Sequence, residues 1–387
     1  MDLSERHGML GRLAEIIVNY STGVKPGDLV VIHADPIAMP IIEAITEAVV
    51  AAGGHPHWHA RSEAIEQILV EQGNETQLDY LSPLDKHMFE TADVRIAPWA
   101  EVNTRALSAV DPKRQAARAR ARRPLISTLM KRFNAGQLRW CGFAYPTQAM
   151  AQDAEMSLRQ YERFVFHACK LHLPDPIAAW KEVRERQEVL REFLQGKEEV
   201  RFFVPPHGGH DGTDLRVSVG QSTWINCHGK ENFPDGEVFA GPQGAEGHVN
   251  YTYPALENGR GVEGVRLQFK GGRAVEATAR RDEAFLVEML DQDEGARNMG
   301  EIAIGTNYDV ASFSRNTLFD EKIGGTFHAA VGAGYPESGS TNESGLHWDM
   351  VCELRPDPAT GRPGGTIEAD GEVFSRDGEI LVEGWAK

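Results

Sequence analysis

The sequence predicts an α/β N-terminal domain with a mostly parallel sheet, followed by an α+β, mainly antiparallel C-terminal domain. Before about residue 198, short β-rich runs alternate with helical patterns, which is typical of a parallel sheet covered by helices. After that point Gly and Pro become frequent and runs of period two dominate, as in LRVSV at 215–219. At roughly 150 residues per domain, a chain of 387 residues fits two domains, which we place at 1–198 and 199–387.

The first half contains the alternating elements in order. Residues 1–20 carry apolar side chains at helical spacing, interrupted by acidic residues, which favours an amphipathic first helix over a signal peptide. GDLVVIHA at 27–34 follows a Pro-Gly turn and predicts a strand. The pattern predicts a helix over 40–52 that ends at a Gly-Gly pair. HPHWHA at 55–60 and ADVRIAPWA at 92–100 predict two further strands.

Two charged helices follow. Residues 111–124 carry six basic side chains in an Ala-rich background, a pattern that can bind nucleic acid. The chain is acidic, however, and no aromatic residues interleave, so we expect a solvated helix face or a salt-bridged contact within a dimer. Residues 179–200 predict a strongly charged amphipathic helix with a narrow buried stripe.

Composition excludes several functional classes. A net charge of -17 disfavours nucleic acid phosphates and anionic membranes as partners. The four cysteines lie far apart, which is typical of free thiols in a reducing compartment, and we expect a cytoplasmic protein. No apolar run approaches the roughly 20 residues of a membrane span. The sequence contains neither a phosphate-binding glycine motif nor a G-x-S-x-G motif.

Two histidine-rich segments are weak candidates for metal binding. His55, His57 and His59 share one face of a predicted strand, but no carboxylate is near them in sequence. The segment HGGHDGTDL at 207–215 has ligand-type residues, yet its Asp and Gly residues are equally typical of a turn before a strand. We expect structural roles for both segments.

The segment 325–351 is a stronger candidate. In LHWDMVCEL the pattern is β-like, so His347 and Asp349 project to one side of a strand and Trp348 to the other. Imidazole and carboxylate are usual ligands of zinc and neighbouring divalent ions. A pair of this kind is also found as buried hydrogen-bonded partners. His328 and Tyr335 are the only chemically active side chains of the small-residue run FHAAVGAGYP.

Two upstream glutamates stand in similar settings. Glu237 follows a Gly turn in PDGEVFAGP, and Glu301 precedes Ile-Ala-Ile in RNMGEIAIGTN. Burying a carboxylate is costly unless it is paired or binds a metal. Each glutamate alone is equally consistent with a salt bridge, but the combined pattern favours a metal site.

These ordered segments, with HWDMV and the strand pair GGTIEADGEVFSRDGEI, resemble the aminopeptidase T and aminopeptidase S family of metallopeptidases. The resemblance covers residues 200 to the C-terminus and, less specifically, KPGDLVVIHA. It implies a homodimeric, metal-dependent aminopeptidase with a dinuclear centre of zinc or cobalt. The implied ligands are Glu237, Glu301, His328, His347 and Asp349.

The resemblance implies that a metal-activated hydroxide removes N-terminal residues from short peptides, whose free α-amine binds the second metal. Tyr335 then matches the family's active-site tyrosine, which either contacts metal or stabilises the oxyanion. We assign the shuttling of a proton to Glu301, in addition to its role as a ligand. Two departures are a short segment between Tyr335 and His347 and Met350 where the family tends to have Phe. The short segment indicates a trimmed loop at the mouth of the site.

Two alternatives stay open at this stage. His328, His347 and Asp349 also form the 2-His-1-carboxylate set of Fe(II) oxygenases, including ring-cleaving 2,5-dihydroxypyridine dioxygenases that resemble this fold. A non-catalytic binding protein that keeps the fold is the other alternative. The two glutamates favour the dinuclear aminopeptidase over the iron enzyme, and the complete ligand set argues against a protein without catalysis.

Overall fold

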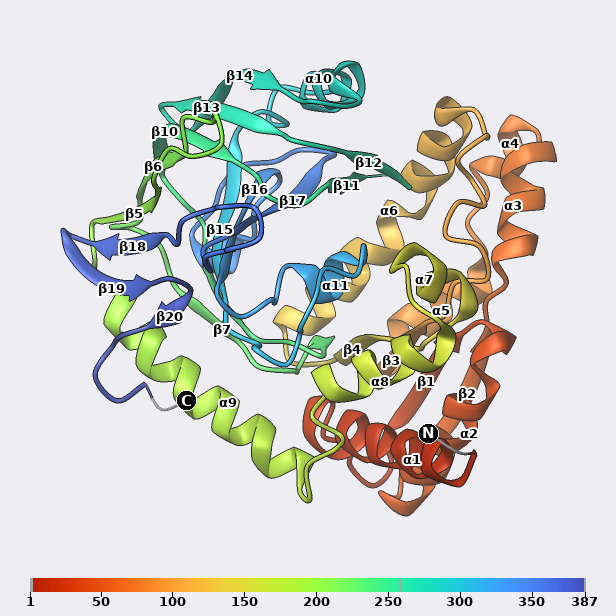
Figure 1. The fold of residues 1–387 in the computed structure, drawn as a ribbon. Helices are drawn as coiled ribbons and strands as arrows, with labels where there is room; N and C mark the ends of the chain where they lie inside the picture. Colours follow the sequence, from red (N-terminus) through yellow and green to blue (C-terminus); the bar gives the residue numbers. More distant parts are fainter. Residues whose placement is uncertain (1–2, 258, 386–387) are drawn as a thin grey trace. The chain divides into compact units, whose positions relative to one another are not determined.

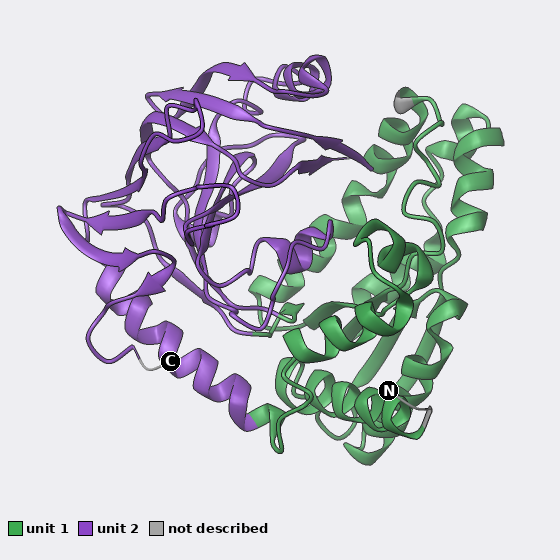
Figure 2. Cartoon of the chain, viewed as in Figure 1, with its two compact units in different colours: residues 1–177, 229–234 green, residues 178–228, 235–387 purple. Residues whose placement is uncertain are grey.

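The computed structural model describes residues 3–257 and 259–385. The chain divides into two compact units, residues 1–177 with 229–234 and residues 178–228 with 235–387 (Figure 2). Strand β8 therefore belongs to the first unit although it comes after the first strands of the second unit in sequence. The predicted division into domains 1–198 and 199–387 stays a prediction.

The first unit is built around a five-stranded sheet in the order β2-β1-β3-β4-β8, in which every pairing is parallel (Figure 1). Its strands are β1 Leu29–Ala34, β2 His55–Ala60, β3 Val94–Trp99, β4 Arg139–Ala144 and β8 Asn232–Phe233. Its helices are α1 Leu3–Ile16, α2 Met39–Ala51, α3 Glu63–Gln72, α4 Glu75–Leu78, α5 Pro83–Thr91, α6 Pro112–Asn134, α7 Gln148–Asp153 and α8 Leu158–Ala168. Helices connect the parallel strands β1, β2, β3 and β4, so the predicted α/β fold is confirmed.

The second unit is antiparallel. An eight-stranded sheet has the order β14-β13-β10-β6-β5-β18-β19-β20, and a five-stranded sheet has the order β17-β16-β15-β9-β7. The strands of the larger sheet are β5 Glu199–Val204, β6 Thr213–Ser218, β10 Gly244–Asn250, β13 Arg266–Lys270, β14 Arg273–Thr278, β18 Thr366–Ala369, β19 Glu372–Arg376 and β20 Glu379–Ile380. Those of the smaller sheet are β7 Ile225–Cys227, β9 Glu237–Ala240, β15 Met299–Gly305, β16 Thr326–Gly332 and β17 His347–Glu353. A hairpin of β11 Ala255–Glu257 and β12 Arg260–Val262 and the helices α9 Pro176–Leu194, α10 Glu283–Leu290 and α11 Thr317–Asp320 complete the unit. The predicted mainly antiparallel α+β fold is confirmed.

One hydrophobic core joins the two sheets of this unit. It contains Phe202 and Leu215 of the larger sheet together with Phe327 and Trp348 of the smaller one. The rings of Phe202 and Phe327 stack with their centroids 4.3 Å apart. Because one face of the smaller sheet is committed to this core, the alternate side chains of its strands must project from the opposite face.

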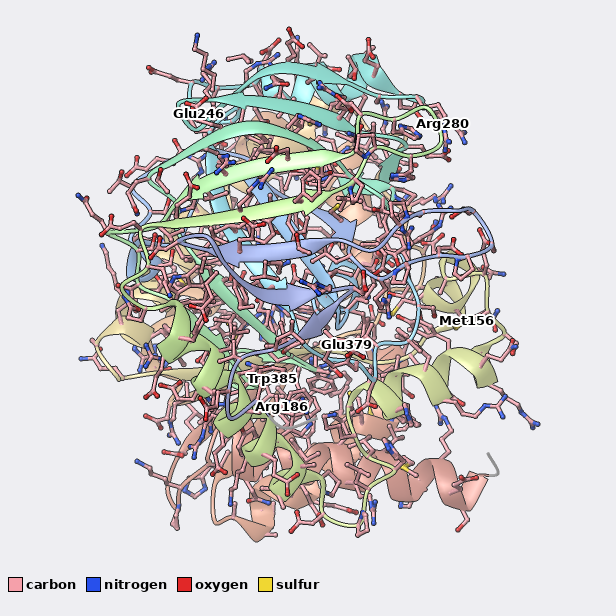
Figure 3. All side chains as sticks on the ribbon, turned by 60° about the vertical axis from the view of Figure 1, so that its left-hand side comes forward. Met156, Arg186, Glu246, Arg280, Glu379 and Trp385 are labelled. Atoms are coloured by element: carbon pink, nitrogen blue, oxygen red, sulfur yellow. The ribbon has the colours of Figure 1, made fainter. Side chains whose placement is uncertain are left out.

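Helix α9 fixes the edge of the smaller sheet. Gln187 is fully buried and donates to the carbonyl oxygens of Cys227 at 2.7 Å and Glu237 at 3.1 Å. At the outer side of the same helix the Arg186 guanidinium lies 5.1 Å from the ring of Trp385, near the C-terminus (Figure 3). The predicted extent of this helix to residue 200 is wrong, because Gly196 adopts a φ of 88° and the chain turns there into β5.

The basic helix α6 has a structural role in the first unit. Its Arg114 donates to carbonyl oxygens at the end of α3, its Arg118 to those of Leu78 and Tyr80 at and after the end of α4, and its Arg132 to those of Phe89 and Ala92 at the end of α5. The prediction of a solvated face is therefore wrong for Arg114 and Arg118, because the orphan carbonyls at helix C-termini bind these guanidinium groups. None of the helices in the described ranges combines the length and apolar character that a bilayer crossing requires.

Candidate metal centre

The five predicted ligands come from four adjacent strands of the smaller sheet. Glu237 is the first residue of β9, Glu301 and His328 are the third residues of β15 and β16, and His347 and Asp349 are the first and third of β17. Sequence neighbours of these residues, including Ile302, Phe327 and Trp348, face the core. The period-two alternation of each strand therefore places all five side chains on the face opposite the core.

Small residues on this face leave room for the charged groups. Ala330 of β16 pairs with Glu301 on one side and with Asp349 on the other. Gly305 pairs with Glu237. Gly236, just before Glu237, adopts a φ of 127°, and a Cβ there would lie 2.6 Å from the Cβ of Asn307. The glycine is thus needed for both the backbone conformation and the close approach that brings Glu237 to the site.

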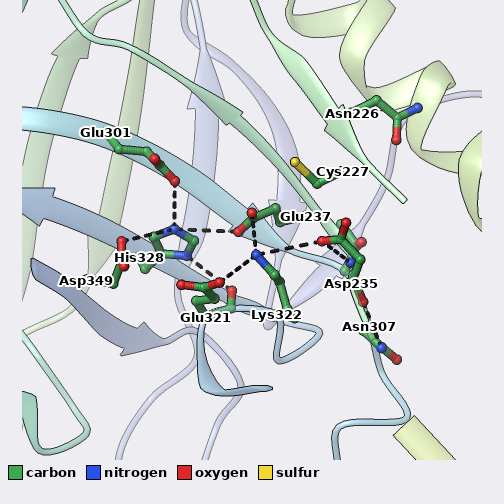
Figure 4. A network of polar contacts seen from close by, with 12 residues as sticks. Asn226, Cys227, Asp235, Glu237, Glu301, Asn307, Glu321, Lys322, His328 and Asp349 are labelled. Carbon is green, nitrogen blue, oxygen red and sulfur yellow. Dashed lines mark hydrogen bonds and ion pairs between the residues drawn. The ribbon is translucent and has the colours of Figure 1, made fainter. Parts of the chain in front are cut away.

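His328 lies at the centre of the cluster and is fully buried. Its Nε2 is 3.1 Å from Glu301 Oε1, 3.6 Å from Glu237 Oε2 and 3.7 Å from Asp349 Oδ1 (Figure 4). His347 Nε2 lies 3.4 Å from Asp349 Oδ1 and 4.0 Å from Glu301 Oε2. Four of these five side chains are almost fully buried, whereas the side chain of His347 is 27% exposed.

Backbone carbonyls set the orientation of both imidazoles. His328 Nδ1 lies 3.1 Å from the carbonyl oxygen of Glu321, and His347 Nδ1 lies 2.7 Å from that of Ala333. With Nδ1 as the donor to a carbonyl, Nε2 is left with its lone pair toward the carboxylates when the ring is neutral. This arrangement is the usual one for histidines that bind metals.

The carboxylate oxygens are the clearest sign that the cluster is incomplete by itself. Glu237 Oε2, Glu301 Oε2 and Asp349 Oδ1 are buried and have no hydrogen-bond partner. Ligand-type atoms of Glu237, Glu301 and His328 lie within 4.8 Å of one another, and so do those of Glu321, His328 and Asp349. Imidazole nitrogen and carboxylate oxygen are the donors that Zn²⁺ and its neighbours prefer, so these residues fit divalent metal ions.

The charges of the cluster shift the pKa of its members strongly. Burial by itself would lower the pKa of His328, but the hydrogen bond to Glu301 and the charges of Glu237 and Asp349 raise it to about 9. Burial opposes the carboxylate charges at His347 too, and Asp349 and Glu301 raise its pKa to about 11. Without a metal, protons on the two histidines thus offset part of the negative charge.

Tyr335 stands beside this cluster. Its ring packs edge-to-face against that of His347, with centroids 5.3 Å apart, and against Phe239 at 5.7 Å. The residue is 41% exposed, so the phenol is open to solvent on one side. Burial of its other side and the charges of Glu301 and Asp349 raise the pKa of Tyr335, which keeps the hydroxyl protonated as a hydrogen-bond donor.

Sequence reasoning missed three charged members of the cluster. Glu321 and Lys322 follow α11, and Asp235 precedes Glu237 by two residues. Lys322 Nζ lies 2.5 Å from Glu237 Oε1, 2.7 Å from Glu321 Oε1 and 3.7 Å from Asp235 Oδ1 (Figure 4). A run of Asp-Glu-Lys is typical of an exposed turn, so its only sequence signal is its position a few residues before His328.

The two weaker histidine segments do not join this cluster. In the first unit His59 lies 3.4 Å from Asp85, while His55 and His57 are exposed. In the second unit Asp211 pairs with Arg266 at 2.7 Å and Asp214 with Arg201 at 2.8 Å. These ion pairs account for both aspartates, and among the described residues neither segment contributes to a group of metal-ligand atoms.

Comparison with known proteins decides the family. The model of the thermophilic metalloprotease (M29) family matches residues 7–379. The chain belongs to this family. The predicted relationship to aminopeptidases T and S is therefore confirmed, as is the prediction of a metal-dependent hydrolase.

Its M29 relatives include aminopeptidase 2 of Geobacillus stearothermophilus, which is 27% identical over 355 residues that span 84% of each chain. Aminopeptidase T of Thermus aquaticus is 31% identical over 62% of this chain and 63% of its own. The structure of wild-type AmpT from Thermus thermophilus matches with a TM-score of 0.81 at 23% identity, covering 97% of this chain and 99% of that one. This likeness supports the fold described above.

Proposed function

We propose that this M29 protein is an aminopeptidase that removes N-terminal residues from short peptides with two divalent metal ions, zinc or cobalt, held by Glu237, Glu301, His328, His347 and Asp349. The observation that carries the proposal is the convergence of these side chains on one sheet face with three buried carboxylate oxygens that lack hydrogen-bond partners. Buried polar groups are normally satisfied, so a cluster of this kind is expected to bind cations.

The charge of the cluster supports two ions. Five buried or largely buried carboxylates gather here, namely those of Asp235, Glu237, Glu301, Glu321 and Asp349. Among the described residues the ammonium that contacts these carboxylates is that of Lys322, which leaves four negative charges when the histidines are neutral. Two divalent cations neutralise this charge, whereas a single Fe²⁺ would leave half of it uncompensated in a buried site.

Divalent ions held by these residues would supply an activated water at neutral pH and a Lewis acid for the scissile carbonyl. The chain's own residues then act around them. With Oε2 given to a cation, Glu301 keeps Oε1, 3.1 Å from His328 Nε2, and we assign to this carboxylate the acceptance and return of a proton. The protonated phenol of Tyr335 donates to the oxyanion that forms on the carbonyl oxygen.

Three further features belong to the proposal. The named aminopeptidase relatives support peptides with a free N-terminus as substrates. The resemblance to aminopeptidases T and S supports a homodimer. The four cysteines all lie among the described residues and none of them forms a disulfide, which supports a reducing location such as the cytoplasm.

The deciding experiment measures the metal content of the purified protein beside that of Glu237→Ala. We expect about two zinc or cobalt ions per chain, a lower content in the variant, and hydrolysis of aminoacyl anilides by the wild type. An anilide with an acetylated α-amine is the matched substrate control, and it should resist hydrolysis. One iron per chain that is unaffected by Glu237→Ala would overturn the proposal and direct attention to dihydroxypyridines and oxygen uptake.

A further inference from the structure

Lys322 is an unusual neighbour for a metal site. Its side chain is 1% exposed, and its ammonium contacts the carboxylates of Glu237, Glu321 and Asp235 (Figure 4). A buried lysine is stable only with such partners. One carboxylate is sufficient for an ion pair. The two closest carboxylates to the Lys322 ammonium, however, are those of Glu237 and Glu321, which belong to different groups of candidate ligands.

The contacts divide the oxygens of Glu237 between two tasks. Oε1 accepts from Lys322 Nζ at 2.5 Å. Oε2 has no hydrogen-bond partner and lies 3.6 Å from His328 Nε2. The ammonium thus occupies one oxygen of this carboxylate and leaves the other for a cation.

The same ammonium connects two groups of ligand atoms that share His328. Among the described residues, Glu237, Glu301 and His328 form one of them and Glu321, His328 and Asp349 form the other. A third group, Cys227, Asp235 and Glu237, overlaps the first at Glu237. Lys322 contacts Glu237 of the first group and Glu321 of the second, with Oε1 of Glu321 at 2.7 Å. Its position couples the orientation of one carboxylate in each group.

We propose that Lys322 is a positioning residue of the metal centre: its ammonium, anchored by Glu321, holds one oxygen of Glu237 and so keeps Glu237 a one-oxygen ligand. This inference rests on the proposed metal site. One-oxygen binding leaves more positions on each ion for water and substrate than a chelating carboxylate would, and a catalytic site needs such open positions.

The visible absorption per bound Co²⁺ ion reports the coordination of the metal, and a loss of protein stability alone does not change it. The metal-free protein is titrated with Co²⁺, whose visible absorption per ion weakens as its coordination number rises. Lys322→Met removes the ammonium while keeping a chain of similar length. The freed oxygen of Glu237 then chelates, and we expect the absorption per bound cobalt to fall about two-fold. Lys197→Met, which removes a lysine paired with Glu372 at 3.4 Å on the surface of the same unit, is the matched control and should keep the wild-type spectrum.

A second measurement uses the wild type alone, because Lys322→Met could fail to fold. In a crystal structure of the cobalt-loaded protein we expect Lys322 Nζ to remain within hydrogen-bond distance of Glu237 Oε1, with the ion on Oε2 only. A chelating Glu237 with Lys322 displaced would overturn the inference, as would a Lys322→Met spectrum identical to that of the wild type. A wild type that binds no cobalt would instead overturn the proposed function itself.

Discussion

The two units handle concentrated charge in opposite ways. In the first unit the guanidinium groups of α6 are satisfied by helix-end carbonyls and carboxylates of the same unit, as at Arg118, which contacts Glu66 at 2.9 Å and the Tyr80 carbonyl at 2.9 Å. In the second unit buried carboxylates converge on His328 and keep oxygens without hydrogen-bond partners. The first arrangement is satisfied by groups of the protein itself, whereas the second presents carboxylate oxygens that cations would satisfy. Charge density alone therefore does not identify a functional site; unsatisfied charge does.

The largest expected effect is on catalysis by the carboxylate cluster of the second unit. Glu301→Gln keeps the shape of the side chain but removes a negative charge and the proton acceptor next to His328. We expect kcat for aminoacyl-anilide hydrolysis to fall by about 10³-fold, within the usual range for loss of acid–base catalysis. Glu372→Gln, on the surface of the same unit, is the control and should keep full activity. Retained activity in Glu301→Gln would show that the cluster does not depend on this oxygen.

Removing the metal should destabilise the second unit and leave the stability of the first unit unchanged. Ions that bind only the folded state stabilise it by about 4 kcal/mol when the free metal is 1,000 times its Kd. We expect chelation to increase hydrogen exchange in β15, β16 and β17, measured by mass spectrometry, because the carboxylates then repel one another. Exchange in β1 and β3 should not change. An equal increase of hydrogen exchange in the sheet of the first unit and in the smaller sheet of the second would contradict the assignment of unsatisfied charge to the second unit alone.

In the first unit, where the charges of α6 are paired, Arg118→Met should reduce the stability of the unit without affecting metal binding. The change leaves Glu66 and two carbonyl oxygens without their donor, and hydrogen bonds to charged groups contribute about 1.5–3 kcal/mol. We expect a loss of about 2 kcal/mol, located in α3 to α5 by hydrogen exchange. Arg120→Met is the matched control on the same helix. The Arg120 side chain is 68% exposed and forms a weak ion pair with Asp79 at 3.9 Å, so its loss should cost little stability. A similar loss in both variants would show that helix propensity, and not the helix-end contacts, is responsible.

The contrast explains what the sequence could predict. Alternation in the β17 segment was sufficient to predict that His347 and Asp349 share a face opposite Trp348, because a strand that packs on a core on one side must alternate. Lys322 and Arg118 could not be predicted in the same way. Both belong to charged runs that are typical of solvent-exposed segments, and their burial depends on tertiary partners far away in sequence, such as Glu237 and Tyr80. Local patterns therefore predict which face a residue occupies, while only the fold decides whether a charge is satisfied.

The last expected effect develops only at acid pH, and it tests whether the first unit also buries a titratable side chain whose hydrogen-bonding partner is present. His33 of β1 is 8% exposed, and its Nδ1 accepts a hydrogen bond from Arg95 at 3.0 Å. Burial and the charges of Arg95, His59, Arg61 and Arg122 lower its pKa from 6.5 to about 3. Below pH 6.5 the unfolded chain binds a proton that the folded unit excludes, so the stability that His33 contributes is present above pH 6.5 and is lost as the pH falls.

At pH 5 this loss should reach about 2 kcal/mol, since each pH unit below 6.5 costs about 1.4 kcal/mol. We expect His33→Asn, which keeps an acceptor for Arg95 but does not titrate, to remove that part of the acid sensitivity. The protein is equilibrated in urea at pH 7 and pH 5 and then pulse-labelled with deuterium at one fixed pH, so that peptides of β1 report the first unit alone. His55→Asn changes an exposed histidine of the neighbouring strand and should retain the wild-type pH dependence. If His33→Asn also retains the wild-type pH dependence, His33 is not the source of the acid sensitivity. The first unit then satisfies the charge of Arg95 without relying on a neutral histidine.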